Sequence, residues 1–258
     1  MPLDVFPLWL VFVAALSIII CANEIGFRFG RARARRPQYE QEPTVGGIVA
    51  AELGLLAFML AFTFGMGATR FEARREALLD EANAIGTTYL RTQFLDDRAR
   101  TEARQLLIEY VDVRLSAVAD GKLDTGIRRS AEIQSSLWER AVSAAHADAR
   151  SIPVGLFVES LNTMIDLHSK RMTMGLRNRI PTIVWIVLMV VAALSFGSMG
   201  YSNGLVGAQR TPVIFPVALS FAVVLGLVVD VDRPQEGMLR VSQQPMIELR
   251  ATMQDTKQ

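Results

Sequence analysis

The sequence holds few of the side chains that enzymes and metal sites use. Its two histidines, His146 and His168, lie far apart in the chain, and the lone Cys21 excludes a disulfide within it. CxxC, HExxH, GxGxxG and Walker A patterns are all absent. We therefore expect no enzyme and neither a metal site nor a cofactor. We interpret His168, which falls on an apolar helical stripe, as a packing histidine, with a proton switch as the alternative.

A carboxylate inside an apolar stretch carries the clearest chemical signal. Glu52 lies about two turns inside Gly46–Ala68, where a charged side chain costs roughly 2.5–3.5 kcal/mol unless it faces protein or water. At about 100° per residue, Glu52 shares one helical face with Met59, Thr63, Arg70, Glu81 and Thr88. We predict that Glu52, Met59, Thr63 and Met66 line a pore. Local hydration or pairing of Glu52 near the membrane interface is the alternative.

Two aromatic residues of the same stretch point away from that face. Phe58 and Phe62 would form an apolar constriction if they reached a pore axis, because an apolar ring can close a pore by excluding water. Ordinary packing is the competing interpretation, and aromatic side chains in a membrane helix serve packing more often.

The elements that would position these residues are four apolar blocks, at residues 7–27, 46–68, 180–200 and 213–229. About 20 apolar residues span a bilayer core, so the blocks predict four transmembrane helices. The chain is 51% hydrophobic with a net charge of +1, which gives no basic footprint for nucleic acid. We expect an all-α integral membrane protein whose surroundings are the lipid bilayer.

The polar region between the second and third blocks predicts a helical domain inserted outside the membrane. Residues 46–91 contain no proline, so we expect the second span to continue unbroken past Arg70 to about Tyr89 and into this domain. Helical periodicity predicts three further helices, one after the cap at Asp96, one over residues 125–150 and one starting at residues 151–153. The expected organisation is residues 1–69 with spans one and two and an Arg-rich connecting loop, 70–179 as the helical domain, 180–231 as spans three and four, and 232–258 as a short polar tail.

Connectivity predicts a cluster of ion pairs at one membrane face. Span two leaves the bilayer, span three enters it and span four leaves it on the same side, which places Arg70, Arg177, Arg179, Asp230 and Asp232 at similar depth. We predict that Asp230 or Asp232 pairs with Arg177 or Arg179 in a bidentate bond. Local pairing of Asp232 with Arg233 is the alternative.

The positive-inside rule gives conflicting indications of the orientation in the membrane, because basic residues flank the spans on both faces. Five arginines at residues 28–36 favour a cytoplasmic first loop. Nine basic residues near the spans on the other face favour cytoplasmic termini and helical domain, and we expect the latter; they are Arg70, Arg74, Arg75, Lys170, Arg171, Arg177, Arg179, Arg233 and Arg240.

Four segments, LAFTFG (60–65), DEANAIGTTYLR (80–91), LRNRIP (176–181) and DVDRPQEGMLRVSQQP (230–245), resemble a bacterial membrane-protein family described as having a bestrophin-like domain. The resemblance covers nearly the whole chain. It implies a location in the bacterial inner membrane. The further likeness to bestrophins themselves lies in the shared layout, and it implies a pentameric channel for inorganic ions whose second span lines the pore. The acidic calcium-binding cluster of bestrophins has no counterpart that can be identified in this sequence.

Two classes of function fit these features. The first is a homo-oligomeric ion channel or pore-like membrane protein, which explains a polar stripe on a span that continues into water. The second is a membrane-anchored helical interaction or signalling module without transport activity, which explains the helical domain without a role for Glu52. Oligomeric state and ion flux distinguish the two.

Overall fold

The computed structural model describes residues 6–36, 45–176, 178–207, 214–233 and 237–255, and within these ranges it is helical without strands. The chain divides into two units. The membrane unit comprises Met1–Phe71 and Arg179–Arg240, and the helical unit comprises Glu72–Asn178 and Val241–Gln258. The all-α fold predicted from the sequence is therefore confirmed.

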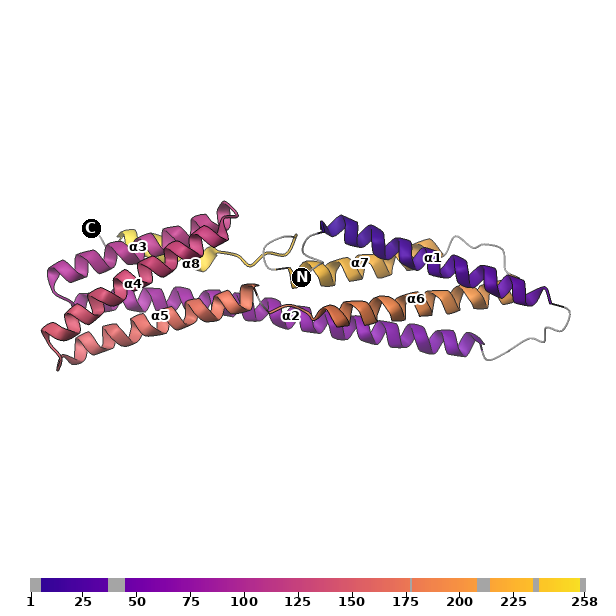
Figure 1. The fold of residues 1–258 in the computed structure, drawn as a ribbon, viewed down its shortest axis with the longest axis horizontal. Coiled ribbons are helices and arrows are strands. Elements are labelled where there is room, and N and C mark those ends of the chain that lie inside the picture. Colours follow the sequence, from indigo (N-terminus) through magenta and orange to yellow (C-terminus); the bar gives the residue numbers. More distant parts are fainter. Residues whose placement is uncertain (1–5, 37–44, 177, 208–213, 234–236, 256–258) are drawn as a thin grey trace. The chain divides into compact units, whose positions relative to one another are not determined.

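Among the described residues, four helices are long and apolar enough to cross a membrane. They are α1 (Leu8–Ala34), α2 (Val45–Arg91), α6 (Thr182–Leu205) and α7 (Ile214–Asp232) (Figure 1). As predicted, α2 runs without a break past Arg70, so one helix contributes to both units. The Arg-rich connection differs from the prediction, because α1 continues to Ala34 and carries Arg28, Arg31 and Arg33 on its last turns. Arginine is a good helix former, and the first proline after the span is Pro37.

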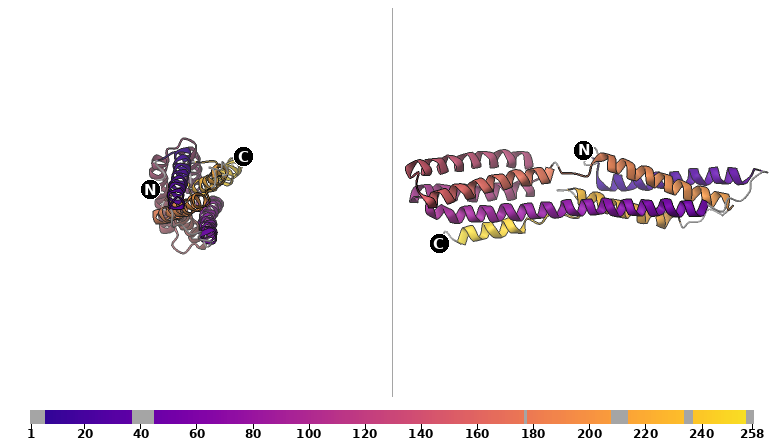
Figure 2. Two further views of the ribbon diagram at one scale, coloured as in Figure 1. Left: turned by 90° about the vertical axis from the view of Figure 1, so that its right-hand side faces the viewer. Right: turned by 90° about the horizontal axis from the view of Figure 1, so that it is seen from below.

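In the membrane unit, α1 and α6 lie side by side with their backbones in close contact (Figure 2). Glycines make this approach possible. A Cβ added at Gly26 would lie 1.9 Å from the carbonyl oxygen of Gly197, and one at Gly200 would lie 2.0 Å from that of Asn23. Asn23 also donates a hydrogen bond from Nδ2 to the carbonyl of Phe196 at 3.1 Å. Small residues at the interface are the usual means of close helix packing in membranes.

The helical unit contains the second part of α2 with α3 (Asp97–Ala119), α4 (Leu123–Ala147), α5 (Ile152–Leu176) and α8 (Gln244–Asp255). A short 3₁₀ helix, Thr92–Phe94, follows α2. Asp96 caps α3 as predicted, because its side chain accepts a hydrogen bond from the amide of Ala99 at 2.9 Å. Gly121, with φ +67°, follows the end of α3.

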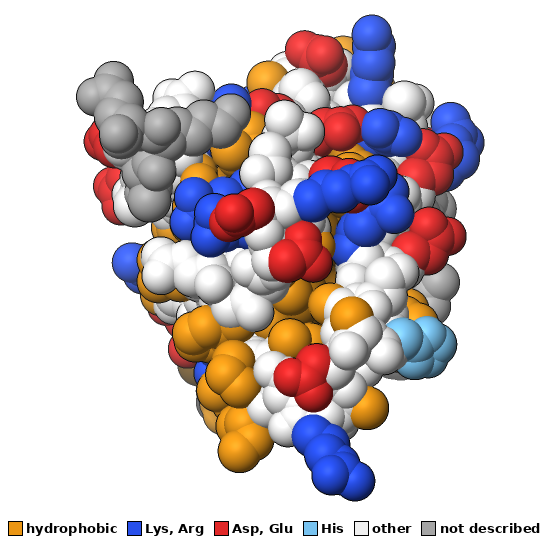
Figure 3. All heavy atoms as spheres, turned by 90° about the vertical axis from the view of Figure 1, so that its left-hand side faces the viewer, with side chains coloured by type: hydrophobic (Ala, Val, Ile, Leu, Met, Phe, Trp, Pro, Cys, Tyr) orange, Lys and Arg blue, Asp and Glu red, His pale blue; other side chains and the backbone are white. Residues whose placement is uncertain are grey.

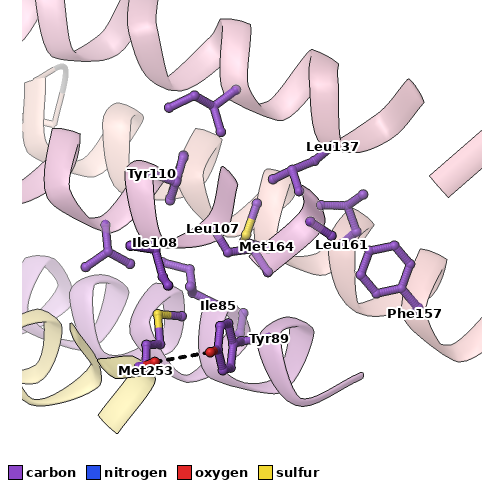
Figure 4. Close-up of a cluster of buried hydrophobic side chains, with 14 of the residues drawn as sticks. Ile85, Tyr89, Leu107, Ile108, Tyr110, Leu137, Phe157, Leu161, Met164 and Met253 are labelled. Atoms are coloured by element: carbon purple, nitrogen blue, oxygen red, sulfur yellow. Dashed lines mark hydrogen bonds between the residues drawn. The ribbon is translucent and has the colours of Figure 1, made fainter. Parts of the chain in front are cut away.

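The core of the helical unit draws side chains from all five of these helices. Figure 4 shows Ile85, Leu107, Leu137, Phe157 and Met253 in one buried cluster. The hydroxyl of Tyr89 donates a hydrogen bond to the carbonyl of Met253 at 3.1 Å (Figure 4). The segment predicted as a short polar tail therefore differs from expectation.

That segment forms α8. Met246 and Met253 lie about two helical turns apart, so both fall on one face of the helix, and both are buried. The units divide at 71/72 and 178/179, beside the expected boundaries at 69/70 and 179/180.

On the face shown in Figure 3, acidic and basic side chains are interspersed, with apolar side chains between and below them.

Candidate functional site

The residues predicted to line a pore lie on the face of α2 that packs within the membrane unit. Thr63 is 1% exposed, and its hydroxyl donates to the carbonyl of Met59 at 2.7 Å. Met59, Met66 and Glu52 are half-buried. Ser195 of α6 donates to the backbone carbonyl of Glu52 at 3.3 Å, which fixes α6 beside this face. The stripe read from the sequence is thus a real face of α2, and a pore lined by it stays a prediction.

The Glu52 side chain places a carboxyl oxygen inside the second span. Its Oε2 atom is buried and has no hydrogen-bond partner among the described residues. A carboxyl oxygen buried without a partner is costly and marks a functional position more often than a structural one in a membrane segment.

A second face of α2, about 100° around the helix from Met59 and Thr63, is exposed and carries the two candidate constriction residues. Phe58 is 69% exposed and Phe62 is 63% exposed. Glycines lie on the same helix, and a Cβ added at Gly54 or Gly65 would meet nothing within 4 Å. The span part of α2 also exposes Ile48 and Leu55, but the exposed side of α6 is more uniformly aliphatic; it presents Ile183, Ile186, Val187, Val190 and Leu194.

The predicted ion-pair cluster brings some of its members together through backbone atoms. Arg179 donates from Nη1 to the carbonyl of Asp232 at 2.8 Å. The Asp232 carboxylate accepts from the amide of Ile180 at 3.1 Å. Arg70 donates to the carbonyl of Met66 at 3.4 Å, within its own helix. Arg177 lies outside the described residues, so its predicted pairing is untested.

Asp230 uses its carboxylate to close the chain reversal after α7. Its two oxygens accept from the amides of Met238 at 2.9 Å and Leu239 at 3.0 Å. Gly237 has φ +118°, and a Cβ there would lie 1.8 Å from Asp230 Oδ1. Only glycine fits both the backbone angle and the close approach. A bidentate carboxylate–arginine bond at Asp230 or Asp232 stays a prediction.

The most extensive polar site is a buried network in the helical unit, centred on Glu81 of α2. Glu81 and Tyr110 are both 0% exposed, and His168 is 7% exposed. The Tyr110 hydroxyl lies 2.9 Å from Glu81 Oε1 and 2.8 Å from His168 Nδ1. Gln134 Nε2 donates to the same hydroxyl at 3.3 Å. Side chains from α2, α3, α4 and α5 therefore meet around one phenol oxygen.

Two guanidinium groups share the other oxygen of Glu81. Arg171 of α5 donates to Glu81 Oε2 at 2.5 Å and to Gln243 Oε1, just before α8, at 3.1 Å. Arg114 of α3 lies farther away, with Nη2 at 3.5 Å from the same Oε2 atom. The network thus ties α2, α3, α4 and α5, and the residue that precedes α8, to one carboxylate.

Electrostatics fix the charge states around Glu81. Burial opposes ionisation of Glu81, but the hydrogen bond from His168 and the charges of Arg114 and Arg171 outweigh it and hold the pKa of that carboxyl well below its usual range. Burial and the nearby Glu81 charge raise the pKa of Tyr110. Burial lowers the pKa of Arg171 despite the opposing charge of Glu81.

The hydrogen positions follow from those charges. An ionised carboxylate only accepts, so Tyr110 donates its hydrogen to Glu81. His168 Nδ1 lies 2.8 Å from the Tyr110 oxygen and 3.3 Å from Glu81 Oε1. Both of those atoms then have only lone pairs to offer, and Nδ1 must carry a hydrogen. His168 is therefore a bonded member of the network, with its proton on the nitrogen that faces Glu81.

Among the described residues, no group of three or more His, Cys, Asp and Glu side chains is arranged to hold a metal ion. The sequence model of a protein family, described as the bestrophin-like domain, matches residues 14–246 of this chain.

The chain belongs to the bestrophin-like family.

No curated protein and no solved structure matches the chain. The bestrophin-like match covers both units, and it includes Glu52, Asp230 and every member of the network around Glu81. The resemblance predicted from the sequence is confirmed, and with it a bestrophin-family membrane protein.

Sequence reasoning had placed Glu81 on a polar stripe and His168 on an apolar one, without bringing them together. Eighty-seven residues separate this pair in the chain. One signal was present: the stripe through Glu52, Thr63 and Glu81 held a charged residue among positions that fold inward. A carboxylate that shares a helical face with core positions predicts a cationic partner on a neighbouring helix.

Proposed function

We propose that the protein forms a homo-oligomer that conducts inorganic ions across the membrane, with α2 along the conduction path. The family supports a bestrophin-type membrane protein. The single observation that carries the further step is the contrast between the exposed sides of α2 and α6. These exposed side chains are the ones that lipid or another copy of the chain could contact.

The exposed side of α6 suits lipid, because branched aliphatic side chains match acyl chains. The exposed side of α2 combines glycine and alanine with phenylalanine: Ala50, Ala51, Gly54, Ala57, Phe58, Ala61, Phe62 and Gly65 are all exposed. Small residues let membrane helices approach closely, and among the described residues no atom lies within 4 Å of a Cβ added at Gly54 or Gly65. Copies of α2 arranged around an axis would use these small residues and turn Phe58 and Phe62 toward the centre.

Such an arrangement gives Glu52 a defined role. Glu52 is half-buried on the face that borders α6, about 80° around the helix from Phe62 and about 120° from Phe58. A carboxylate near a pore attracts cations and sets the local potential. We propose that Glu52→Gln changes the reversal potential in an asymmetric salt gradient.

The proposed setting is the bacterial inner membrane, with the termini and the helical unit on the cytoplasmic side. The basic residues Arg70, Arg74 and Arg75, directly after the second span, favour this orientation. Five copies per oligomer is the number that the likeness to bestrophins suggests.

The test is the mass of the purified protein in mild detergent, followed by ion flux from liposomes. We expect a closed oligomer larger than a dimer and measurable flux. Phe58→Ala with Phe62→Ala should raise resting flux, because it widens an apolar constriction. Val190→Ala with Leu194→Ala on α6 is the matched control and should leave flux unchanged. A monomer or dimer without flux would contradict the proposal and favour a membrane-anchored interaction module.

A further inference from the structure

Arg114 is a buried guanidinium whose hydrogen-bonding groups are poorly satisfied. It is 8% exposed. Nη2 lies 3.5 Å from Glu81 Oε2, which is long for a hydrogen bond to oxygen, and Nη1 donates to the sulfur of Met172 at 3.6 Å, a weak acceptor. Its Nε atom is buried and has no hydrogen-bond partner within the ranges that the structure describes. A guanidinium has five N–H donors in a fixed plane, so this site has donors to spare.

The charges around Arg114 do not balance. Arg171 lies 2.5 Å from Glu81 Oε2, a full ångström closer than Arg114. One carboxylate therefore faces two guanidinium groups. Its electrostatic interaction with the nearer group, Arg171, is the stronger of the two. The remaining groups of the network, Tyr110, Gln134, Gln243 and the Nδ1–H of His168, supply no second negative charge. The buried cluster therefore holds two guanidinium groups against one carboxylate, and positive charge is in excess beside Arg114.

A second donor without a partner lies at the same level of the unit. Ser130 of α4 is 0% exposed, and its Oγ has no hydrogen-bond partner in the described part of the chain. Two contacts set the register of α3 against α4. A Cβ at Gly126 would lie 2.3 Å from that of Ala117, and Gln134 bonds to Tyr110 at 3.3 Å.

This register places Ser130 and Arg114 across from each other. Ser130 lies one turn from both Gly126 and Gln134 on α4, and Arg114 lies one turn from both Ala117 and Tyr110 on α3. Both residues belong to the buried sides of these helices. Two unpartnered buried donors, from facing helices, thus occur at one level of the interface.

We propose that Arg114 and Ser130 bind a small inorganic anion of the size of chloride between α3 and α4. The ligand must accept hydrogen bonds, because both free groups there are an N–H and an O–H. It must also carry negative charge, because it neutralises the excess on the cluster. A water molecule meets the first requirement and fails the second. The site lies in the helical unit, and its occupation does not depend on whether the protein conducts ions.

Thermal unfolding of the full chain in detergent tests the site. Chloride replaces gluconate at constant ionic strength, so that only the identity of the anion changes. Ligand that binds the folded state raises Tm in a saturable way. At a chloride concentration about five times the dissociation constant, we expect a rise of about 2–4 °C.

The variants separate this site from general salt effects. Ser130→Ala removes one donor, and Arg114→Lys keeps the charge while removing the planar fork; each should abolish the saturable rise. Ser135→Ala is the matched control on α4, because its exposed hydroxyl bonds only to the carbonyl of Ala131, and it should keep the full rise. An equal chloride response in Ser130→Ala and Ser135→Ala would overturn the proposal.

Crystals grown in bromide give an independent measurement that does not depend on variant stability. We expect an anomalous peak within hydrogen-bonding distance of Arg114 Nε and Ser130 Oγ. Density at that position without anomalous signal would identify a water molecule and would overturn the proposal.

Discussion

The two units both bury charged side chains, and the hydrogen bonds described for these side chains differ in kind. In the membrane unit, Asp230 accepts from the backbone amides of Met238 and Leu239, and Arg179 donates to the backbone carbonyl of Asp232. In the helical unit, the Glu81 carboxylate meets the side chains of Tyr110 and Arg171. The Asp230 bonds hold the chain that directly follows α7, and the Arg179 bond joins the residues before α6 to the end of α7. The Glu81 bonds join three helices through their side chains.

This difference predicts where the free energy of unfolding is concentrated. A carboxylate bound to nearby amides fixes one loop. Removing that carboxylate should therefore destabilise only that loop. A buried carboxylate held by two arginines from different helices fixes the whole unit, because removing it leaves uncompensated positive charge inside. The following variants test this contrast, starting with the largest expected effect.

Glu81→Gln should destabilise the protein most. It removes the carboxylate that Arg171 and Arg114 share, and breaking a buried pair in this way costs about 3–5 kcal/mol. Thermal unfolding in detergent measures the loss. Asp80→Asn is the control on the same helix, because Asp80 is half-exposed and pairs with Lys170 at 3.4 Å. It should cost less than about 1 kcal/mol, and equal losses in the two variants would refute the central role of Glu81.

Gly237→Ala should have the next largest effect, in the membrane unit. A Cβ there would lie 1.8 Å from Asp230 Oδ1 and would strain a backbone at φ +118°. We expect a cost of about 1–3 kcal/mol. Gly207→Ala is the matched control, with φ +68° and nothing within 4 Å of the added Cβ. Its loss should be smaller, and the reverse order would mean that the Asp230 reversal does not constrain the fold.

Acid should weaken the helical unit through Glu81. The folded-state pKa of this carboxyl lies below its ordinary value of 4.5, so the unfolded chain binds the proton more readily in the range between the two. Its stabilising contribution is present above pH 4.5 and declines as pH falls toward the folded-state pKa. Tm measured against pH should therefore fall less steeply on the acid side in Glu81→Gln than in the wild type. Parallel curves would contradict the assignment.

The smallest effect is expected at the surface of the helical unit. Arg250 of α8 donates to both carboxylate oxygens of Asp112 on α3, at 2.5 and 2.9 Å, and both side chains reach solvent. Asp112→Asn should cost at most about 1 kcal/mol, and less at high salt. Hydrogen exchange of the α8 amides would show the loosening directly. A loss as large as that of Glu81→Gln would show that α8 depends on this pair rather than on Met246 and Met253.

The elements of the fold could be predicted from the sequence because their signals are local. The length of the apolar blocks gave the four spans, and the absence of proline gave the continuous α2. Periodicity also gave the correct common face for Glu52, Thr63 and Glu81. It could not say which way that face turns, and the structure buries Thr63 and Glu81 at 1% and 0% exposure.

The candidate network could not be predicted because its partners are set by tertiary packing. Tyr110 and His168 are 58 residues apart, and Arg171 and Gln243 are 72 apart. Each residue alone has the features of an ordinary core or surface position. The tail was misjudged for a related reason, since two methionines in a polar segment become informative only when a neighbouring helix is there to cover them.

Access of a water-soluble reagent to α2 tests the central claim, that its exposed aromatic face lies along the conduction path. Phe58→Cys is made in a Cys21→Ser background, together with Val190→Cys on the exposed side of α6 as the control. Both proteins are reconstituted in liposomes and treated with a charged methanethiosulfonate, with modification confirmed by mass. We predict that modification of Phe58→Cys blocks most of the ion flux and that Val190→Cys is unaffected. Full flux through a modified Phe58→Cys protein would contradict the account.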